Sequence, residues 1–302
     1  MIQTIPMQVL SSDGVHNLEG IVYLPQGTPK GIFQIVHGMT EYIGRYDDFM
    51  RAMTEAGYVC FGYDHLGHGK TAAADGIYGY IAPKDGWKLL CQDVNRFAEA
   101  VRTQYGKALP YYLMGHSMGS FIARIAVAEG LSKPDKLIVM GTGGPNPLAA
   151  PGLALLKLIR ALYGEKHISP FAEKIMFGSY NQKFQEDDPY AWLTKDQGVR
   201  DRYRQDPWCT FHFTITALLD LIRLTKNANR VAGREDVPVL LVSGKMDPVG
   251  NYGKGIGQVG NRMEKSGATV TMKLYENARH EILNDDCKEA VTKDILYFID
   301  NL

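Results

Sequence analysis

The chain has 302 residues, of which 45% are apolar and 22% are charged, the composition of an ordinary globular protein with a sizeable core. Its 33 basic residues balance 33 acidic ones without a long run of either sign, so charge gives no reason to expect a nucleic-acid partner. The four cysteines lie far apart without a Cys-x-x-Cys pair, which favours buried free thiols.

The first ten residues, MIQTIPMQVL, have neither a basic start nor a continuous apolar run, so we expect no signal peptide. No stretch of about 18 apolar residues follows, which argues against a membrane-spanning helix. We therefore expect a cytoplasmic protein.

Short apolar runs alternate with helical patterns through the first 140 residues. The runs are rich in β-branched or aromatic residues, and they predict strands at 18–24, 31–36, 58–63, 110–114 and 136–140. Helices are predicted between them, at 45–56, 87–101 and 117–129. This alternation predicts an α/β fold in which helices cover both faces of a parallel sheet.

The alternation is interrupted after residue 140. The stretch GTGGPNPLAAPG at 141–152 marks a boundary, and beyond it the pattern is helical to about residue 230, without a convincing strand. Helices with broad apolar faces are predicted there at 153–163 and 211–225. Strands at 237–244 and 269–275 and a closing helix at 285–301 then resume the first pattern. We therefore expect a core at 1–145 and 233–302, with a helical insertion at 146–232.

One serine lies between two glycines where a strand is predicted to give way to a helix. The segment 115–119, GHSMG, has the pattern Gly-x-Ser-x-Gly in the strand–turn–helix context that this motif requires. A sharp turn would strain the backbone at Ser117, and residues larger than glycine would collide with the strand and helix beside it. The glycines could also serve only to make the turn compact, so the motif needs partners elsewhere in the chain.

A serine hydroxyl becomes a nucleophile when a base takes its proton and a third group orients that base. On a sheet of this kind, an acid and then a histidine are expected further along the chain, each after a strand. Asp247 and His280 occupy such positions. Each has an ordinary alternative, as a turn residue and as a surface histidine beside the last helix. The order and spacing of all three favour a catalytic triad of Ser117, Asp247 and His280.

The charge that develops on an attacked carbonyl oxygen requires hydrogen-bond donors. We expect the backbone N–H of Met118, directly after the serine, to be one. The loop HGMTEY at 37–42 follows the strand at 31–36 and makes Met39 the second candidate. Backbone groups donate whatever the side chain is, which explains why methionines can serve in this oxyanion hole.

Other histidines invite a functional interpretation. His37 precedes the oxyanion loop, and we expect it to hold that loop by a hydrogen bond rather than to act as the base. The run DHLGHG at 64–69 resembles a metal cluster, but no further ligand stands at a suitable spacing. We therefore expect neither a metal nor an organic cofactor.

Together these segments resemble a known family, the α/β-hydrolases of the monoacylglycerol lipase and lysophospholipase type, which are also grouped with serine aminopeptidases. The resemblance covers nearly the whole core and rests on HGMTEYIGRY (37–46), YDHLGHGKT (63–71), GHSMGS (115–120), SGKMDPVG (243–250) and ARHEI (278–282). It implies an eight-stranded, mostly parallel sheet with a helical cap inserted after the sixth strand. Two features depart from the family: Lys70-Thr71 replaces a usual serine, and the cap does not match the well-known lipases closely.

The resemblance also implies roles for particular residues. Ser117, Asp247 and His280 correspond to the triad, Met39 and Met118 to the oxyanion donors, and Glu41, Arg45 and Asp64 to supports around the oxyanion loop. We expect an esterase that acts on small acyl esters, with monoacylglycerols and lysophospholipids as the implied substrates.

Three alternatives stay open. The same triad could cleave peptides as an aminopeptidase, with the acidic run 186–188 holding a substrate amine. The scaffold could instead bind a ligand without turning it over. The apolar helix at 153–163, which carries Lys157 and Arg160, could make transient contact with a membrane.

Overall fold

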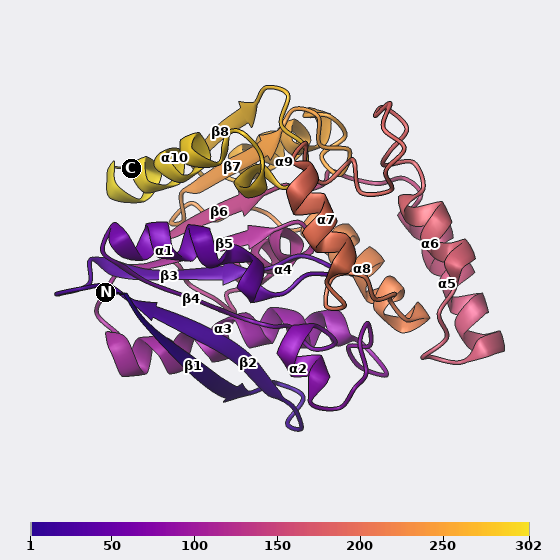
Figure 1. Ribbon diagram of the computed structural model, residues 1–302, viewed down its shortest axis with the longest axis horizontal. Helices are drawn as coiled ribbons and strands as arrows, with labels where there is room; N and C mark the ends of the chain where they lie inside the picture. Colours follow the sequence, from indigo (N-terminus) through magenta and orange to yellow (C-terminus); the bar gives the residue numbers. More distant parts are fainter. Residues whose placement is uncertain (1, 302) are drawn as a thin grey trace.

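Within residues 2–301, which the structure describes, eight strands form one sheet at the centre of the molecule (Figure 1). The computed structural model gives the strand order β1-β2-β4-β3-β5-β6-β7-β8. Its strands are β1 (Gln3–Leu10), β2 (Asn17–Leu24), β3 (Gly31–Val36), β4 (Tyr58–Tyr63), β5 (Tyr111–His116), β6 (Lys136–Met140), β7 (Val239–Gly244) and β8 (Val270–Tyr275). Strand β2 pairs antiparallel with β1 and β4, whereas all other neighbours are parallel. The expected eight-stranded, mostly parallel sheet is confirmed.

Helices cover both faces of this sheet because successive strand residues point to opposite sides. In β3, Phe33 and Ile35 pack in one apolar cluster with α1 (Asp47–Glu55) and α10 (Lys288–Asn301). Ile32 and Val36 pack in the other cluster. That cluster contains residues of α3 (Gly86–Tyr105), α4 (Met118–Ala128) and α9 (Lys254–Lys265). Shorter helical turns complete the core, namely η1 (Ile43–Tyr46), α2 (Gly69–Ala73) and η2 (Ile282–Asn284).

Strand β1 was not expected from the sequence pattern. None of the residues of Gln3–Leu10 is fully buried, and the strand pairs only with β2 at the edge of the sheet. Its alternation of exposed and half-buried side chains lacks the continuous apolar run by which the central strands were recognised.

Four helices lie between β6 and β7, namely α5 (Ala149–Tyr163), α6 (Pro170–Phe177), α7 (Gln197–Gln205) and α8 (Ile215–Ala228). Figure 1 shows them gathered at one end of the sheet, with α5 and α6 outermost. Helix α8 begins later than predicted because the side chain of Thr214 accepts a hydrogen bond from the backbone N–H of Ala217 and caps the helix.

Among residues 2–301, no helix combines the length and the apolar character needed to cross a bilayer. The cytoplasmic location stays a prediction.

Candidate active site

Ser117 stands at the turn between β5 and α4 in a strained conformation. Its φ of 54° and ψ of −119° lie where L-residues are rare, and such strain is characteristic of functional sites. A Cβ atom on Gly119 would collide with the carbonyl oxygen of Val36, and one on Gly115 with the carbonyl oxygen of Gly119. The two glycines are therefore required by the close approach of strand, turn and helix.

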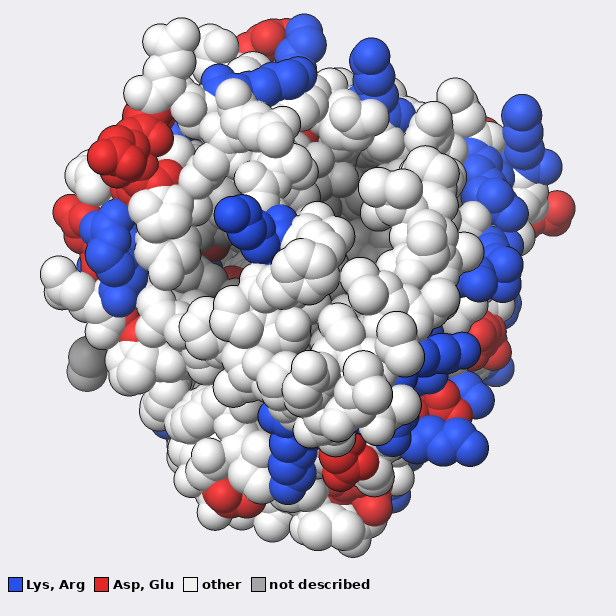
Figure 2. Space-filling view, turned by 90° about the vertical axis from the view of Figure 1, so that its right-hand side faces the viewer, with Lys and Arg blue, Asp and Glu red and all other residues white. Residues whose placement is uncertain are grey.

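The turn opens on a cavity of about 640 Å³ at the carboxyl end of the parallel strands. Ser117, His280, Met39 and Met118 all line this cavity, together with residues from α5, α6 and α8. Figure 2 views the molecule from the side of these helices and shows a deep hollow between mostly uncharged side chains. An apolar cavity with a few polar groups at its floor is typical of a small-molecule site.

The structure brings His280 and Asp247 together at the floor of the cavity. The imidazole Nδ1 lies 3.0 Å from Oδ2 of Asp247, and the two side chains are 2% and 0% exposed. The carboxylate also accepts hydrogen bonds from the hydroxyl of Ser243 and the backbone N–H of Val249. Because Nδ1 donates to a carboxylate, Nε2 of the neutral ring is left as a proton acceptor.

The hydroxyl of Ser117 makes no hydrogen bond to any of residues 2–301, although it lines the same cavity as His280. Hydrogen bonds between nucleophile and base are often long in unliganded enzymes and shorten when substrate binds. Within the same range, no acceptor pairs with the backbone N–H of Met39 or Met118. Two unpaired donors beside a strained serine can bind an oxyanion.

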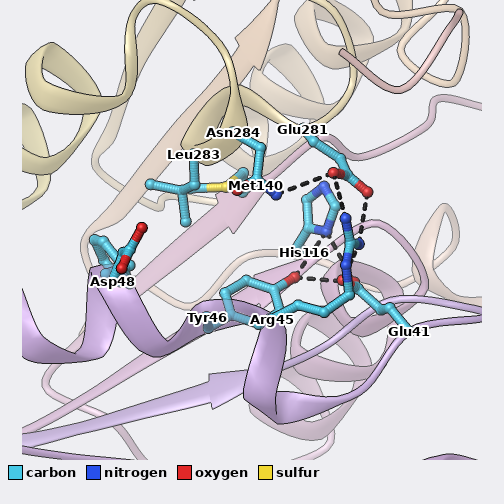
Figure 3. Close-up of a pocket in the computed structure, with 10 residues that line it drawn as sticks. Glu41, Arg45, Tyr46, Asp48, His116, Met140, Glu281, Leu283 and Asn284 are labelled. Atoms are coloured by element: carbon cyan, nitrogen blue, oxygen red, sulfur yellow. Dashed lines mark hydrogen bonds and ion pairs between the residues drawn. The ribbon is translucent and has the colours of Figure 1, made fainter. Parts of the chain in front are cut away.

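A buried network of charged and aromatic side chains lies behind the histidine, around a small cavity of about 20 Å³ (Figure 3). We refer to its members as the buried network: Glu41, Arg45, Tyr46, His116 and Glu281. The resemblance had implied support by Glu41 and Arg45 but did not include His116 or Glu281. Both could have been noticed as the direct sequence neighbours of Ser117 and His280.

Three groups of the buried network have shifted pKa values that report how they are paired. Burial alone would raise the pKa of Glu41, but the hydrogen bond and charge of His116, followed by Arg45, lower it well below its usual range. Burial opposes charge on His116 as well, yet the hydrogen bond and charge of Glu41 raise its pKa. Glu281 is held below its usual pKa by Arg45 against the effect of burial.

The insertion also contacts the loop that carries His280. The backbone N–H of His280 donates to the carbonyl of Trp192 at 3.3 Å, and that of Glu281 donates to the carbonyl of Leu193 at 2.7 Å. The indole of Trp192 lies 5.1 Å from the imidazole of His280, centre to centre. Sequence patterns gave no signal for these contacts, since they join residues far apart in the chain.

The remaining candidates lie beneath the oxyanion loop. His37 is fully buried, and its Nδ1 lies 2.8 Å from the carbonyl oxygen of Gly38 while Nε2 accepts the backbone N–H of His65. Burial lowers the pKa of His37. Asp64 accepts the backbone N–H groups of Ile43 and Lys70. Among residues 2–301, no three His, Cys, Asp or Glu side chains are grouped so as to hold a metal.

The sheet, the strained serine and the histidine–aspartate pair define an α/β-hydrolase, a serine hydrolase of the ester-cleaving kind. The family described as serine aminopeptidase, S33, matches residues 27–287, and the chain belongs to this family.

Individual relatives are similar over almost their whole length. The chain is 27% identical to the monoglyceride lipase of Rattus norvegicus, over 98% of this chain and 91% of that protein. It is 25% identical to the monoacylglycerol lipase of Mycolicibacterium smegmatis, over 96% and 98%. A thermostable carboxyl esterase from Bacillus coagulans, solved in complex with glycerol, superposes with a TM-score of 0.92 at 30% identity and covers 99% of both chains.

Proposed function

We propose that the chain hydrolyses carboxylic esters through an acyl intermediate on Ser117. One observation carries this proposal: a strained serine opens on the same cavity as a histidine that a buried aspartate orients. Ser117 attacks the ester carbonyl while Nε2 of His280 takes the hydroxyl proton and then passes it to the departing alcohol. Asp247 keeps the imidazole in the required tautomer and stabilises its cationic form. Water activated by His280 then releases the acid.

The backbone N–H groups of Met39 and Met118 stabilise the oxyanion in this mechanism. Support comes from their position on the cavity wall and from the lack of any other acceptor for them within residues 2–301. Removing one such donor typically costs about 10²–10³ in rate.

Monoacylglycerols and lysophospholipids are the proposed substrates. Apolar side chains line much of the cavity, among them Phe121, Met176, Phe177, Leu221 and Ile222. Each methylene group that such a wall removes from water contributes about 0.8 kcal/mol to binding, which favours an acyl chain. The names of the curated relatives, monoglyceride lipase and monoacylglycerol lipase, support the same substrate class.

Residues 146–232 act as a cap over the active site in this proposal, and 1–145 and 233–302 form the catalytic core. The four helices between β6 and β7 support this division, since they supply walls of the cavity while the triad residues come from the core.

Transient contact with an anionic lipid surface is proposed for the outer helices α5 and α6. Most of the exposed large apolar side chains among residues 2–301 are found between 148 and 175: Leu148, Leu158, Leu162, Tyr163, Ile168, Phe171 and Ile175. Lys157 and Lys174 stand on the same helices and form no ion pair within the described residues. Apolar side chains beside unpaired lysines suit the boundary of an anionic bilayer. Co-sedimentation with phosphatidylglycerol vesicles tests this contact.

The aminopeptidase alternative requires an acidic pocket for a substrate amine, and the run 186–188 was its candidate. Glu186 pairs with Arg200 and Arg279, and Asp188 pairs with Arg204 at 3.0 Å, so their charges already have partners. Asp187 is exposed, and none of the three carboxylates lines the cavity. The apolar cavity and the two paired carboxylates therefore favour the esterase.

A series of p-nitrophenyl esters from acetate to palmitate tests the proposal, measured on the wild type and on Ser117→Ala. We expect an optimum at medium or long acyl chains, loss of at least about 10³-fold in kcat in the variant, and labelling of the wild type alone by a fluorophosphonate. An optimum at acetate contradicts the lipid substrates. Equal turnover by both proteins contradicts the mechanism. Faster cleavage of aminoacyl-nitroanilides than of any ester favours the peptidase, and failure of Ser117 to label favours a binding protein.

A further inference from the structure

The buried network touches three loops of the proposed active site at once. Glu41 accepts a hydrogen bond from the backbone N–H of Gly38, directly before Met39 in the oxyanion loop. His116 directly precedes Ser117, and its Nε2 lies 3.3 Å from the carbonyl oxygen of His280. Glu281 directly follows His280. The oxyanion loop, Ser117 and His280 therefore each have a neighbour in the buried network.

Arg45 joins the two carboxylates. Its guanidinium donates to both oxygens of Glu281 at 2.7 and 2.8 Å, and to Oε2 of Glu41 at 3.1 Å. A two-pronged pair of this kind fixes direction as well as distance, because the planar guanidinium matches the carboxylate. The oxyanion loop and the loop of His280, which belong to opposite ends of the chain, are thus tied to one rigid cation.

The surroundings of His116 favour one protonation state of its ring. Nε2 faces a carbonyl oxygen, which can only accept, so Nε2 carries a proton. Nδ1 lies 3.2 Å from a carboxylate oxygen of Glu41 and 2.9 Å from the hydroxyl of Tyr46, and this hydroxyl donates to the same carboxylate. In a neutral ring with its proton on Nε2, the lone pair of Nδ1 would face the negatively charged carboxylate of Glu41, and the two would repel each other. The structure therefore favours an imidazolium.

The four charges of the buried network then cancel, with Glu41 and Glu281 against Arg45 and His116. All of these groups are buried or nearly so, and the side chain of Arg45 is only 11% exposed. Buried charges are tolerated when they are paired and hydrogen-bonded, and removing one partner leaves another charge without compensation. Loss of a single member should therefore disturb every loop that the network holds.

We propose that the buried network is a positioning device that acts on His280 through Glu281 and on the oxyanion loop through Glu41. The inference rests on the proposed function, since it assigns a role relative to that mechanism. Glu41, His116 and Glu281 border the cavity, but within residues 2–301 no member of the network is hydrogen-bonded to the hydroxyl of Ser117. The effect of the network is to keep base and oxyanion donors at a fixed separation, which matters because a misplacement of about 1 Å can cost about 10²-fold in rate.

The first test is Glu281→Gln, which keeps the size of the side chain and removes its charge. Its matched control is Glu276→Gln, an exposed carboxylate four residues before His280 that pairs with Lys245. We expect Glu281→Gln to lower kcat and the rate of fluorophosphonate labelling by about 10–100-fold. The KM for a soluble short-chain ester should change by less than about twofold, because the acyl chain is proposed to bind against apolar side chains such as Phe121, Phe177 and Ile222, which are not members of the network. The control should match the wild type.

Arg45→Lys supplies a second test, which stands even if Glu281→Gln fails to fold. Lysine keeps the charge but cannot form the two-pronged contact. We therefore expect kcat to fall less than in Glu281→Gln, with KM unchanged. A change confined to the unfolding midpoint, with kcat and labelling kept, contradicts a positioning role.

The protonation of His116 gives a pH readout. The groups that face its ring are Glu41, Arg45 and Tyr46 from one side and His280 and Glu281 from the other, with His37 nearby. We expect wild-type kcat to fall at alkaline pH as His116 loses its proton, and His116→Gln to have a lower kcat without that alkaline titration.

The outcomes separate this inference from the proposed function. Full activity in Ser117→Ala overturns the mechanism whatever the other variants do. An inactive Ser117→Ala together with Glu281→Gln that behaves like Glu276→Gln overturns the positioning role alone.

Discussion

Two parts of the insertion between β6 and β7 differ in what they contact. The outer pair, α5 and α6 at 149–177, presents exposed apolar side chains such as Leu162 and Phe171, which are 67% and 63% exposed. The inner segment, residues 186–209, is hydrogen-bonded to both loops that would carry out catalysis. Two parts of one insertion that line the same cavity therefore differ in their contacts: the outer pair faces solvent, and the inner segment is bonded to the loops of Met39 and His280.

The contacts of the inner segment are specific. Besides the carbonyls of Trp192 and Leu193, which receive the N–H groups of His280 and Glu281, its Tyr203 donates to the carbonyl of Thr40 at 3.0 Å. Thr40 has a φ of 50° in the loop of Met39. The ring of Tyr203 also lies 4.9 Å beneath the guanidinium of Arg45. We therefore expect the inner segment to move with the loops of Met39 and His280 and any opening of the cavity to occur in the outer pair.

The largest expected effect comes from Arg279, which precedes His280. Its guanidinium donates to the carbonyls of Ala191 and Thr194 and pairs with Glu186, so it joins the inner segment to the histidine loop. Arg279→Gln should lower kcat by about 100-fold and the free energy of unfolding by about 2–3 kcal/mol. Ester hydrolysis and urea unfolding measure the two quantities. The matched control is Arg204→Gln, an inner-segment cation that is 42% exposed. Equal losses in both variants would show that this connection has no special role.

A smaller effect is expected from Tyr203→Phe, which removes one hydroxyl. The carbonyl of Thr40 then loses its donor, so we expect a fall in kcat of about 3–10-fold and a loss of about 1 kcal/mol of stability. Tyr163→Phe, on the exposed face of α5, is the comparison from the outer pair and should leave both values unchanged. If Tyr203→Phe keeps the wild-type kcat, the inner segment does not support the oxyanion loop.

The pH dependence of stability should report the ion pair between Arg45 and Glu281, the residue that follows His280. The pKa of Glu281 is lowered from an ordinary value of 4.5, because Arg45 outweighs the effect of burial. A carboxyl group with a lowered pKa in the folded state stabilises the protein above its unfolded pKa, and this stabilisation is lost as pH falls through the folded value. The difference in unfolding free energy between wild type and Glu281→Gln should be full at pH 7 and shrink below about pH 4.5. Urea titrations across that range measure it, and a difference that is constant with pH contradicts the ion pair.

The smallest effect on stability is expected in the outer pair itself. Replacing Leu162 and Phe171 together by serine should change the free energy of unfolding by less than about 0.5 kcal/mol, because both side chains already face water. Binding to phosphatidylglycerol vesicles should nevertheless fall. Unchanged vesicle binding would contradict the proposed lipid contact of α5 and α6, and with it the difference in function between the outer pair and the inner segment.

Local patterns were sufficient for most of the secondary structure. The strands 31–36, 58–63 and 136–140 have the predicted bounds, because each is a short apolar run buried on both faces. The edge strand β1 was missed because its exposed residues carry no such run. The start of α8 was predicted too early because the capping by Thr214 was not recognised.

At the candidate site, local sequence patterns indicate which residue types stand at strand ends and in what order. These patterns single out Ser117, Asp247 and His280. The order of the three residues along the chain predicts that Asp247 and His280 are in contact. The contact of Arg45 with Glu281, 236 residues away, and the contacts of Trp192 and Tyr203 with the loops of His280 and Met39 follow from the packing of the whole chain. The physical reason is that periodicity and turn signals report how a segment meets water or a core, whereas contacts between loops and an inserted segment depend on how the whole chain packs.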